Sequence, residues 1–346
     1  MNFDYKNIYI TGGGGWLGKV LIQTLLNGDP DVLDSFKPFK GRISSFLLEN
    51  EPNIFENKKV EPFFGDIRSI NNCNAFLKDN NNGLLIHCAG IIHPKKVKDF
   101  DTINYQGTKN IINSAISSGI KKIVVVSSNS PIGCNKSNKS LFDENSPYNP
   151  YMGYGKSKKN MEVFLKDHIK AGVDISIIRP PWFYGENMPE RQLTFYKMIK
   201  NGVFPMIGSG KNIRSKANVK NIVQGILLCA GKSVSKGETY WIADERPYTM
   251  KEIVLTVRDV LENEYNIDCA SNHIRLPFFV GELFQICDYL LQSFGIYNQK
   301  VHVASELNKN IGCSIQKAIK QLGYNPRISL YEGIKKSLEG VDLNKI

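Results

Sequence analysis

Tyr154 and Lys158 are the residues whose types and spacing could do chemistry most directly. Side chains four residues apart on a helix project from one face, so the lysine ammonium would lie close to the phenol. A nearby positive charge lowers the pKa of a tyrosine from its usual value of about 10. A tyrosine tuned in this way can pass a proton to or from an alcohol at neutral pH. The spacing is also common on solvated helix faces, so this prediction depends on a second feature.

The second feature is a glycine-rich turn between Thr11 and Gly18, with glycine at every position from 12 to 15. The turn follows a short apolar run at 8–10 and precedes the apolar pattern of an amphipathic helix. Glycines let the backbone approach a pyrophosphate, which the free amides at the start of a helix then hold. An ordinary loop would lose conformational entropy by ordering four consecutive glycines and would gain nothing in return. The turn therefore predicts a pyrophosphate site.

Further motifs occur in a fixed order along the chain: Thr11, Gly12, Gly15 and Gly18 in the turn, Asp66-Ile67-Arg68, His87-Cys88-Ala89-Gly90, Asn104 to Asn110, Val125 to Ser128, Tyr154 with Lys158, and Arg179 to Gly185. With these motifs the chain resembles the extended branch of the short-chain dehydrogenase/reductase superfamily, often called the NAD-dependent epimerase/dehydratase family. The resemblance runs from near Ile8 to near Gly333, with one departure at Cys88.

The resemblance implies a catalytic serine, tyrosine and lysine: Ser128, Tyr154 and Lys158. Ser128 is preferred to Ser127 by counting back from Gly133, where the family's serine segment ends. Ser128, Asn129 and Tyr154 would contact the substrate, and Lys158 would also hold the cofactor ribose. The cofactor-binding residues implied are Thr11, Gly12, Gly14, Gly15, Trp16, Leu17, Gly18, Asp66, Ile67, His87, Cys88, Ala89, Gly90, Asn104, Lys158 and Pro181. No metal is expected.

The choice between NAD and NADP depends on the end of the second strand. An acidic residue there binds the ribose hydroxyls of NAD, whereas an arginine accommodates the phosphate of NADP. Glu49 is the nearest candidate, after an enlarged connection at 29–40. The sequence therefore favours NAD over NADP.

Apolar strand-like runs alternate with helical patterns as far as Arg179. The predicted strands are Asn7 to Thr11, Ile43 to Leu48, Val60 to Phe64, Leu84 to His87, Ile123 to Ser127 and Asp174 to Ile178. Such alternation predicts an α/β fold with a doubly wound parallel sheet of the Rossmann type and the cofactor across its carboxyl edge. The resemblance adds a division into a dinucleotide-binding domain at 1–180, to which 216–245 returns, and a smaller mixed α/β substrate lobe at 181–215 and 246–346.

The substrate is predicted from basic residues in that lobe. Arg214 occupies the position where nucleotide-sugar enzymes of this branch present an arginine to the diphosphate, and Arg191 and Arg275 are secondary candidates. Arginine suits a diphosphate because it is always charged and bidentate. Sugar dehydratases follow their catalytic hydroxyl with Asp-Glu, but Ser128 is followed by Asn129-Ser130, so dehydration is disfavoured. Epimerisation or reduction of a nucleotide-linked sugar is the favoured function.

Two other functions remain open. The aromatic segment Leu276 to Phe294 and the ending 313–326 are similar to the branch that oxidises 3β-hydroxysteroids and sterol carboxylates. The other alternative is a catalytically silent NAD(P)-binding regulatory protein, although such proteins usually lose the tyrosine or the lysine. The segment Leu276 to Phe294 could pack in the core, at a dimer face or on a membrane surface as an amphipathic helix.

Composition narrows the class of protein. The net charge is +11, but the lysines are scattered, which disfavours a nucleic-acid partner. No apolar run approaches the ~18 residues of a transmembrane helix, and the first residues lack a signal-peptide pattern. Seven cysteines without a Cys-x-x-Cys pair argue against disulfides and structural zinc. A cytoplasmic homodimer, the usual assembly of the family, is expected.

Overall fold

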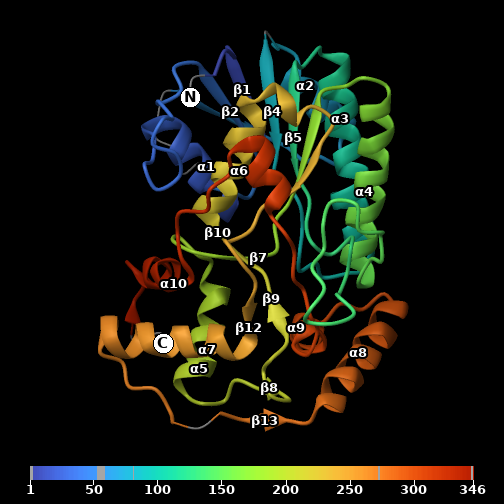
Figure 1. The fold of residues 1–346 in the computed structure, drawn as a ribbon. Coiled ribbons are helices and arrows are strands. Elements are labelled where there is room, and N and C mark those ends of the chain that lie inside the picture. The colour runs from blue at the N-terminus through green and yellow to red at the C-terminus, as the bar shows by residue number, and fades with distance from the viewer. Residues whose placement is uncertain (1–2, 53–58, 81, 272, 344–345) are drawn as a thin grey trace.

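The computed structural model describes residues 3–52, 59–80, 82–271, 273–343 and 346. Its centre is a seven-stranded parallel sheet with the strand order β11-β6-β5-β4-β1-β2-β3 (Figure 1). The strands are β1 (Asn7–Thr11), β2 (Arg42–Leu47), β3 (Val60–Phe64), β4 (Gly83–His87), β5 (Lys122–Val126), β6 (Ile175–Arg179) and β11 (Thr239–Trp241). The predicted fold class is confirmed. Three predicted strands are displaced by one residue, because an apolar pattern does not mark where hydrogen bonding ends.

Helices cover both faces of this sheet (Figure 1). On one face, α1 and α6 pack together over an apolar core that includes Leu21 and Ile226. On the other face, α2, α3 and α4 bury Ile111 and Met161 against β4, β5 and β6. The helices of this part are α1 (Trp16–Asn27), α2 (Ile70–Leu77), η1 (Phe100–Gly107), α3 (Thr108–Ser117), α4 (Met152–Lys170), α6 (Val219–Gly231) and η3 (Ser233–Ser235).

A second core lies below the carboxyl edge of the sheet in the view of Figure 1. It is built on α5, α7 and α10 and includes Tyr196, Val257 and Ile334. The elements of this region are β7 (Trp182–Tyr184), η2 (Glu190–Gln192), α5 (Leu193–Lys200), β8 (Met206–Ile207), β9 (Ile213–Arg214), β10 (Lys216–Asn218), β12 (Tyr248–Thr249), α7 (Met250–Tyr265), β13 (Arg275–Leu276) and α10 (Leu330–Leu338). The short strands pair as β10-β7, β12-β9 and β13-β8.

After residue 180 the chain returns to the sheet region at two places, with segment 216–245 and with η4 (Ala318–Leu322), which packs on α6. After β10, segment 216–245 supplies α6, which packs on α1, and β11, which extends the parallel sheet beside β6. The division into domains at residue 180 stays a prediction.

The aromatic segment that the sequence left open forms α8 (Phe278–Ser293), which packs on α9 (Gln299–Glu306). Core packing, one of the three interpretations of this segment, is wrong, because Phe279, Leu283, Ile286 and Leu290 are all at least half exposed. Figure 1 shows α8 at the outer edge of the molecule, where it contacts α9 and α4.

Candidate active site

Tyr154 and Lys158 lie on the first turns of α4, and both face the interior. The Lys158 ammonium donates to the Val126 carbonyl at the end of β5, at 3.1 Å. Burial lowers the pKa of Lys158 to about 8, against the opposing effect of Glu162. Burial raises the pKa of Tyr154 to about 12, although a hydrogen bond with Ser128 acts in the other direction. The sequence predicted a lowered tyrosine pKa, but burial, together with the charge of Glu306, raises it.

The two serines at the end of β5 have different surroundings. The Ser127 hydroxyl donates to the buried Glu162 carboxylate at 2.6 Å. Ser128 instead contacts Tyr154, and its Oγ lies 3.3 Å from the Ser130 Oγ and 3.3 Å from the Asn129 Oδ1. Ser128 is therefore the serine that the fold brings to the tyrosine.

Glu162 also holds Arg179, the last residue of β6. The carboxylate accepts from the guanidinium at 3.0 and 2.6 Å, and both side chains are no more than 1% exposed. Tyr148 donates to the same carboxylate at 2.9 Å. Burial would raise the pKa of Glu162, but Arg179 and these donors outweigh it and the pKa is lowered. The ion pair ties α4, which carries the tyrosine, to β6.

The glycine turn makes close contacts that only glycine permits. Gly12 has a φ of 73°, and a Cβ there would lie 2.8 Å from the Ala89 nitrogen. A Cβ on Gly18 would lie 2.2 Å from the Gly12 carbonyl oxygen, so helix α1 approaches the turn closely. Gly15 caps α1 with no side-chain hydrogen bond, which leaves the first amides of this helix for a ligand. These features fit a dinucleotide pyrophosphate.

A chain of hydrogen bonds fixes the ends of β1 and β4 relative to each other. The His87 ring lies 2.6 Å from the Thr11 hydroxyl and 2.8 Å from the Thr108 hydroxyl. Thr108 donates to the Asn104 carbonyl, so it accepts from Nε2 of His87, and Thr11 donates to Nδ1. Burial and the charge of Lys158 lower the pKa of His87 to about 3, so the imidazole in this chain of hydrogen bonds is neutral. His87 is a structural link between the two strands.

Asn104 shapes the turn after β4. Its side-chain amide donates to the Ile91 carbonyl at 2.9 Å and accepts from the Ile91 amide at 2.7 Å. A Cβ on Gly90 would lie 3.2 Å from Asn104 and 3.5 Å from the Lys158 ammonium. The Gly90 backbone thus passes next to the lysine, a close approach that suits a flat ligand laid across this turn.

The predicted cofactor-binding residues gather at the carboxyl ends of parallel strands. They follow or end β1 (Thr11, Gly12, Gly14, Gly15, Trp16, Leu17, Gly18), β3 (Asp66, Ile67), β4 (His87, Cys88, Ala89, Gly90) and β6 (Pro181). The Trp16 indole also donates to the Glu186 carbonyl at 2.7 Å, which connects the turn to the second region. Asp66 is held by Arg68 at 2.5 Å, a hydrogen bond that lowers the pKa of Asp66.

The acidic residue beside the glycine turn is Glu51. A Cβ on Gly14 would lie 3.0 Å from Glu51 Oε2, and that oxygen accepts from the Leu48 amide at 2.9 Å. Glu49 is exposed two residues after β2 ends. Sequence reasoning missed Glu51 because the chain reverses after Leu47, and counting along an extended strand cannot show which carboxylate returns to the turn.

The three predicted substrate arginines lie apart. Arg214 is 7% exposed, donates to the Glu306 carbonyl at 2.8 Å, and has a buried Nε without a hydrogen-bond partner among the described residues. Glu306 also raises the pKa of Tyr154, so Arg214 and the tyrosine share this neighbour. Arg191 influences the pKa of His93. Arg275 lies at the outer edge of the second region in β13 (Figure 1).

Lys216 is a buried cation close to Arg214, and it was not predicted from the sequence. It lies two residues after Arg214, is 3% exposed, and its ammonium lies 3.4 Å from the centre of the Trp182 ring. Burial lowers the pKa of Lys216 to about 7, Asp244 opposes this, and the charge of Arg214 adds to it. A lysine between a serine and an alanine carries no sequence signal, because its burial results from the pairing of β10 with β7.

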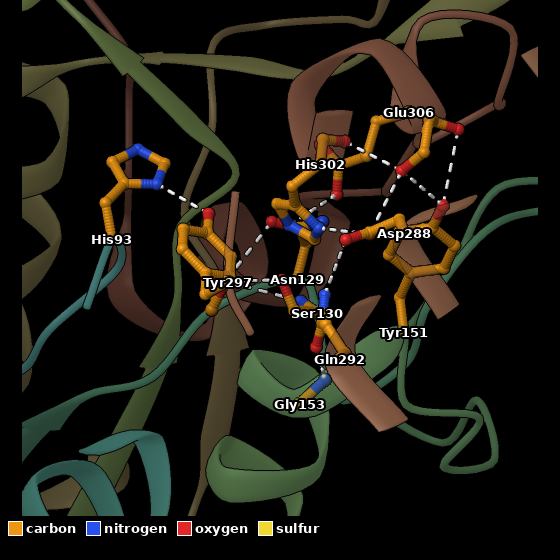
Figure 2. A network of polar contacts seen from close by, with 12 residues as sticks. His93, Asn129, Ser130, Tyr151, Gly153, Asp288, Gln292, Tyr297, His302 and Glu306 are labelled. Atoms are coloured by element: carbon orange, nitrogen blue, oxygen red, sulfur yellow. Dashed lines mark hydrogen bonds and ion pairs between the residues drawn. The ribbon is translucent and has the colours of Figure 1, made fainter. Parts of the chain in front are cut away.

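Helices α8 and α9 supply a polar network next to the start of α4 (Figure 2). Asp288 is fully buried and accepts from His302 at 2.7 Å and from Gln292 at 2.9 Å. The side-chain carbonyl oxygen of Gln292 accepts a hydrogen bond from the backbone amide of Gly153 at 2.9 Å. Gly153 is the residue directly before Tyr154. Burial lowers the pKa of His302, but Asp288 and Glu306 outweigh it and the pKa is raised.

The chain belongs to the extended short-chain dehydrogenase/reductases, whose members use NAD or NADP. The chain belongs to the 3-beta hydroxysteroid dehydrogenase/isomerase family, whose model matches residues 9–271.

Comparison with known proteins gives relatives of several kinds. An uncharacterized protein of Sinorhizobium fredii is 45% identical over 337 residues, 96% of this chain and 94% of that protein. The N-acetyl-alpha-D-glucosaminyl-diphospho-ditrans,octacis-undecaprenol 4-epimerase of Escherichia coli O157:H7 is 32% identical over 68% of this chain and 70% of its own length. The decarboxylating sterol-4-alpha-carboxylate 3-dehydrogenase of Candida albicans is 26% identical over 98% of both chains.

Among solved structures, the dTDP-glucose 4,6-dehydratase of Streptomyces venezuelae, solved with NAD bound, has a TM-score of 0.73. It is 21% identical, and the match covers 96% of each chain. At this identity the similarity shows the fold alone.

Proposed function

We propose that this protein is an NAD-dependent epimerase or reductase that acts on a secondary alcohol or ketone in the sugar of a glycosyl diphosphate. The observation that carries the proposal is the buried guanidinium of Arg214. Its Nε has no hydrogen-bond partner among the described residues, and its Nη2 donates to the backbone carbonyl of Glu306 and not to a carboxylate. A buried charge without a counter-ion is costly, so an anionic ligand is the natural partner.

Nucleotide-linked sugars are the class of glycosyl diphosphate predicted from the sequence. Lipids can carry the same group, as in the substrate named for the Escherichia coli relative. Arg214 would hold the diphosphate, and the anionic group would favour the protonated form of Lys216, whose pKa burial lowers to about 7. The rest of the substrate would extend toward Tyr154, because Glu306 neighbours both Arg214 and the tyrosine.

Three side chains would take part in proton transfer to or from the substrate oxygen. Bound NAD would accept a hydride from the substrate carbon and, in an epimerase, return it. Ser128 would hold the substrate oxygen, and Tyr154 would accept or donate the proton. Lys158 would lower the pKa of the phenol once ligand contacts draw its ammonium away from Val126. Burial raises the pKa of Tyr154 to about 12, so the phenol carries its proton at neutral pH.

The preference for NAD is assigned to Glu51. Glu51→Gln is expected to lower the affinity for NAD about tenfold, because the carboxylate would accept from the ribose hydroxyls and an amide accepts more weakly. The matched control is Glu49→Gln, which changes an exposed glutamate two residues away. Titration with NAD and NADP measures both. An unchanged ratio of the two affinities in Glu51→Gln would place the selection elsewhere.

Arg214 gives the test of substrate class. A sugar diphosphate at a hundred times its dissociation constant stabilises the native state by about 2.7 kcal/mol, which raises the unfolding temperature. We expect UDP-sugars or lipid-diphosphate sugars to produce this shift in the wild-type protein and not in Arg214→Ala. Arg275→Ala is the control, because Arg275 lies in exposed β13 at the edge of the lobe. If the unfolding temperature of Arg214→Ala rose as much as that of the wild-type protein, the diphosphate would not bind at Arg214.

A second candidate function is oxidation of a 3β-hydroxysteroid or sterol-like alcohol. The apolar helix α8 beside the start of α4 favours it, as do the family description and the sterol dehydrogenase relatives. Stabilisation by steroids and not by glycosyl diphosphates would select this function. A homodimer through α3 and α4, as the family resemblance implies, is also proposed, and sedimentation velocity measures it.

A further inference from the structure

Exposed apolar side chains are concentrated on one helix hairpin. Ten of the twenty large hydrophobic side chains exposed in the described part of the chain lie between residues 274 and 303. On α8, Phe279, Leu283, Ile286 and Leu290 follow a spacing of four, three and four residues and form a single stripe. Phe294 extends the stripe and is 79% exposed. The outer face of α8 is therefore apolar along its whole length.

The inner face of the same helix is polar, which fixes its orientation. Asp288 and Gln292 face inward to His302 and Gly153 (Figure 2), at 2.7 and 2.9 Å. Gly281 is buried so closely that a Cβ would lie 2.4 Å from the Asn308 side chain. If α8 rotated to bury the apolar stripe, the hydrogen-bonded side chains of Asp288 and Gln292 would become exposed. The helix is built to present its apolar face outward.

Basic residues lie near both ends of the stripe. Glu282, the exposed carboxylate of α8, is paired with Lys309 at 2.8 Å. The backbone of Lys96 pairs with Ile296 just beyond the helix, which places the exposed Lys95 and Lys96 at that end. Arg275 is exposed three residues before the other end. An apolar stripe with basic residues at its ends suits the surface of an anionic bilayer.

We propose that α8 docks this protein on an anionic membrane surface and that the glycosyl diphosphate is carried by a membrane lipid. The second part rests on the proposed function. Among the described residues no helix is long and apolar enough to cross a bilayer, so the contact is interfacial. The 16 residues of α8 span about 24 Å, too short for the ~30 Å hydrocarbon core, and only one face is apolar.

The docking helix is joined to the catalytic region by direct contacts. Gln292 holds the amide of Gly153, the residue before Tyr154. Tyr297, between α8 and α9, packs edge-on against Phe100 at 5.3 Å, and Phe100 packs against Tyr154 at 5.8 Å. A membrane bound by α8 would therefore be next to the segment that carries the tyrosine.

The experiment is co-sedimentation of the full-length protein with vesicles of phosphatidylglycerol and phosphatidylethanolamine. Phosphatidylcholine vesicles serve as the uncharged control. We expect the wild-type protein to bind the anionic vesicles, more weakly at high salt. The double variant Ile286→Glu/Leu290→Glu should reduce the partition coefficient at least about tenfold, because two apolar contacts are replaced by repelling charges. Val234→Glu is the matched control, since Val234 is 48% exposed on the dinucleotide-binding side.

The outcomes separate the docking surface from the function. Equal binding by the wild-type protein and the α8 double variant, or no binding by either, would overturn the docking proposal. Conversion of a dimer to a monomer by the double variant, without vesicle binding by the wild-type protein, would assign the stripe to a second copy and also overturn it. Vesicle binding through α8 without a thermal shift from any glycosyl diphosphate would keep the docking surface and reject the function. Tighter binding of UDP-sugars than of polyprenyl-diphosphate sugars would reject the lipid carrier alone.

Discussion

Tyr154→Phe is expected to lower the turnover number by about 10²–10⁴-fold, the usual contribution of a positioned general acid or base. The substitution removes only the hydroxyl that would exchange a proton with the substrate oxygen. The ring remains and keeps its contact with Phe100 at 5.8 Å, so the fold and the affinity for NAD should change little. Steady-state assays with the sugar diphosphate that stabilises the protein, together with NAD titration, measure both quantities.

Tyr331→Phe is the control for this prediction. Its hydroxyl donates to Glu264 at the surface, away from the cluster, and its loss should leave turnover unchanged. A Tyr154→Phe enzyme with more than a third of the wild-type turnover would assign the proton transfer to another group. A wild-type protein that binds NAD and substrate but never reduces the cofactor would favour the catalytically silent alternative.

Arg179→Met is expected to destabilise the native state by about 3–5 kcal/mol, the cost of leaving one member of a buried ion pair without its partner. Glu162, which is 0% exposed, would lose all its hydrogen bonds from the guanidinium. Urea unfolding at neutral pH measures the change. Because the pair holds α4 against β6, activity should fall at temperatures where the wild-type protein is still folded.

Two comparisons show whether the ion pair is responsible for this loss. The double variant Glu162→Leu/Arg179→Met removes both charges, and it should be more stable than Arg179→Met alone. Arg42→Met breaks the exposed pair with Glu61 at 3.4 Å, where a loss of no more than about 1 kcal/mol is expected. Equal losses in the buried and the exposed variant would show that burial of the pair does not determine its contribution.

Local patterns in the sequence were sufficient for the frame of the molecule. The six strands predicted before residue 180 are all present, because alternation and apolar runs report the burial of a parallel sheet directly. The glycine turn was recognisable for a similar reason, since the φ of 73° at Gly12 requires glycine whatever surrounds it. Tyr154 and Lys158 were paired by helix geometry alone, although their roles stay predictions.

The sequence by itself therefore determined the parallel sheet, the glycine turn and the position of the tyrosine and lysine, because each depends on residues that are close in the chain. Tertiary structure decided which carboxylate meets the turn, that Lys216 is buried beside Arg214, and that the polar face of α8 points inward. It also decided the raised pKa of Tyr154, which results mainly from burial. These properties depend on contacts between distant segments, and desolvation in particular is a property of the whole packed interior that no local spacing encodes.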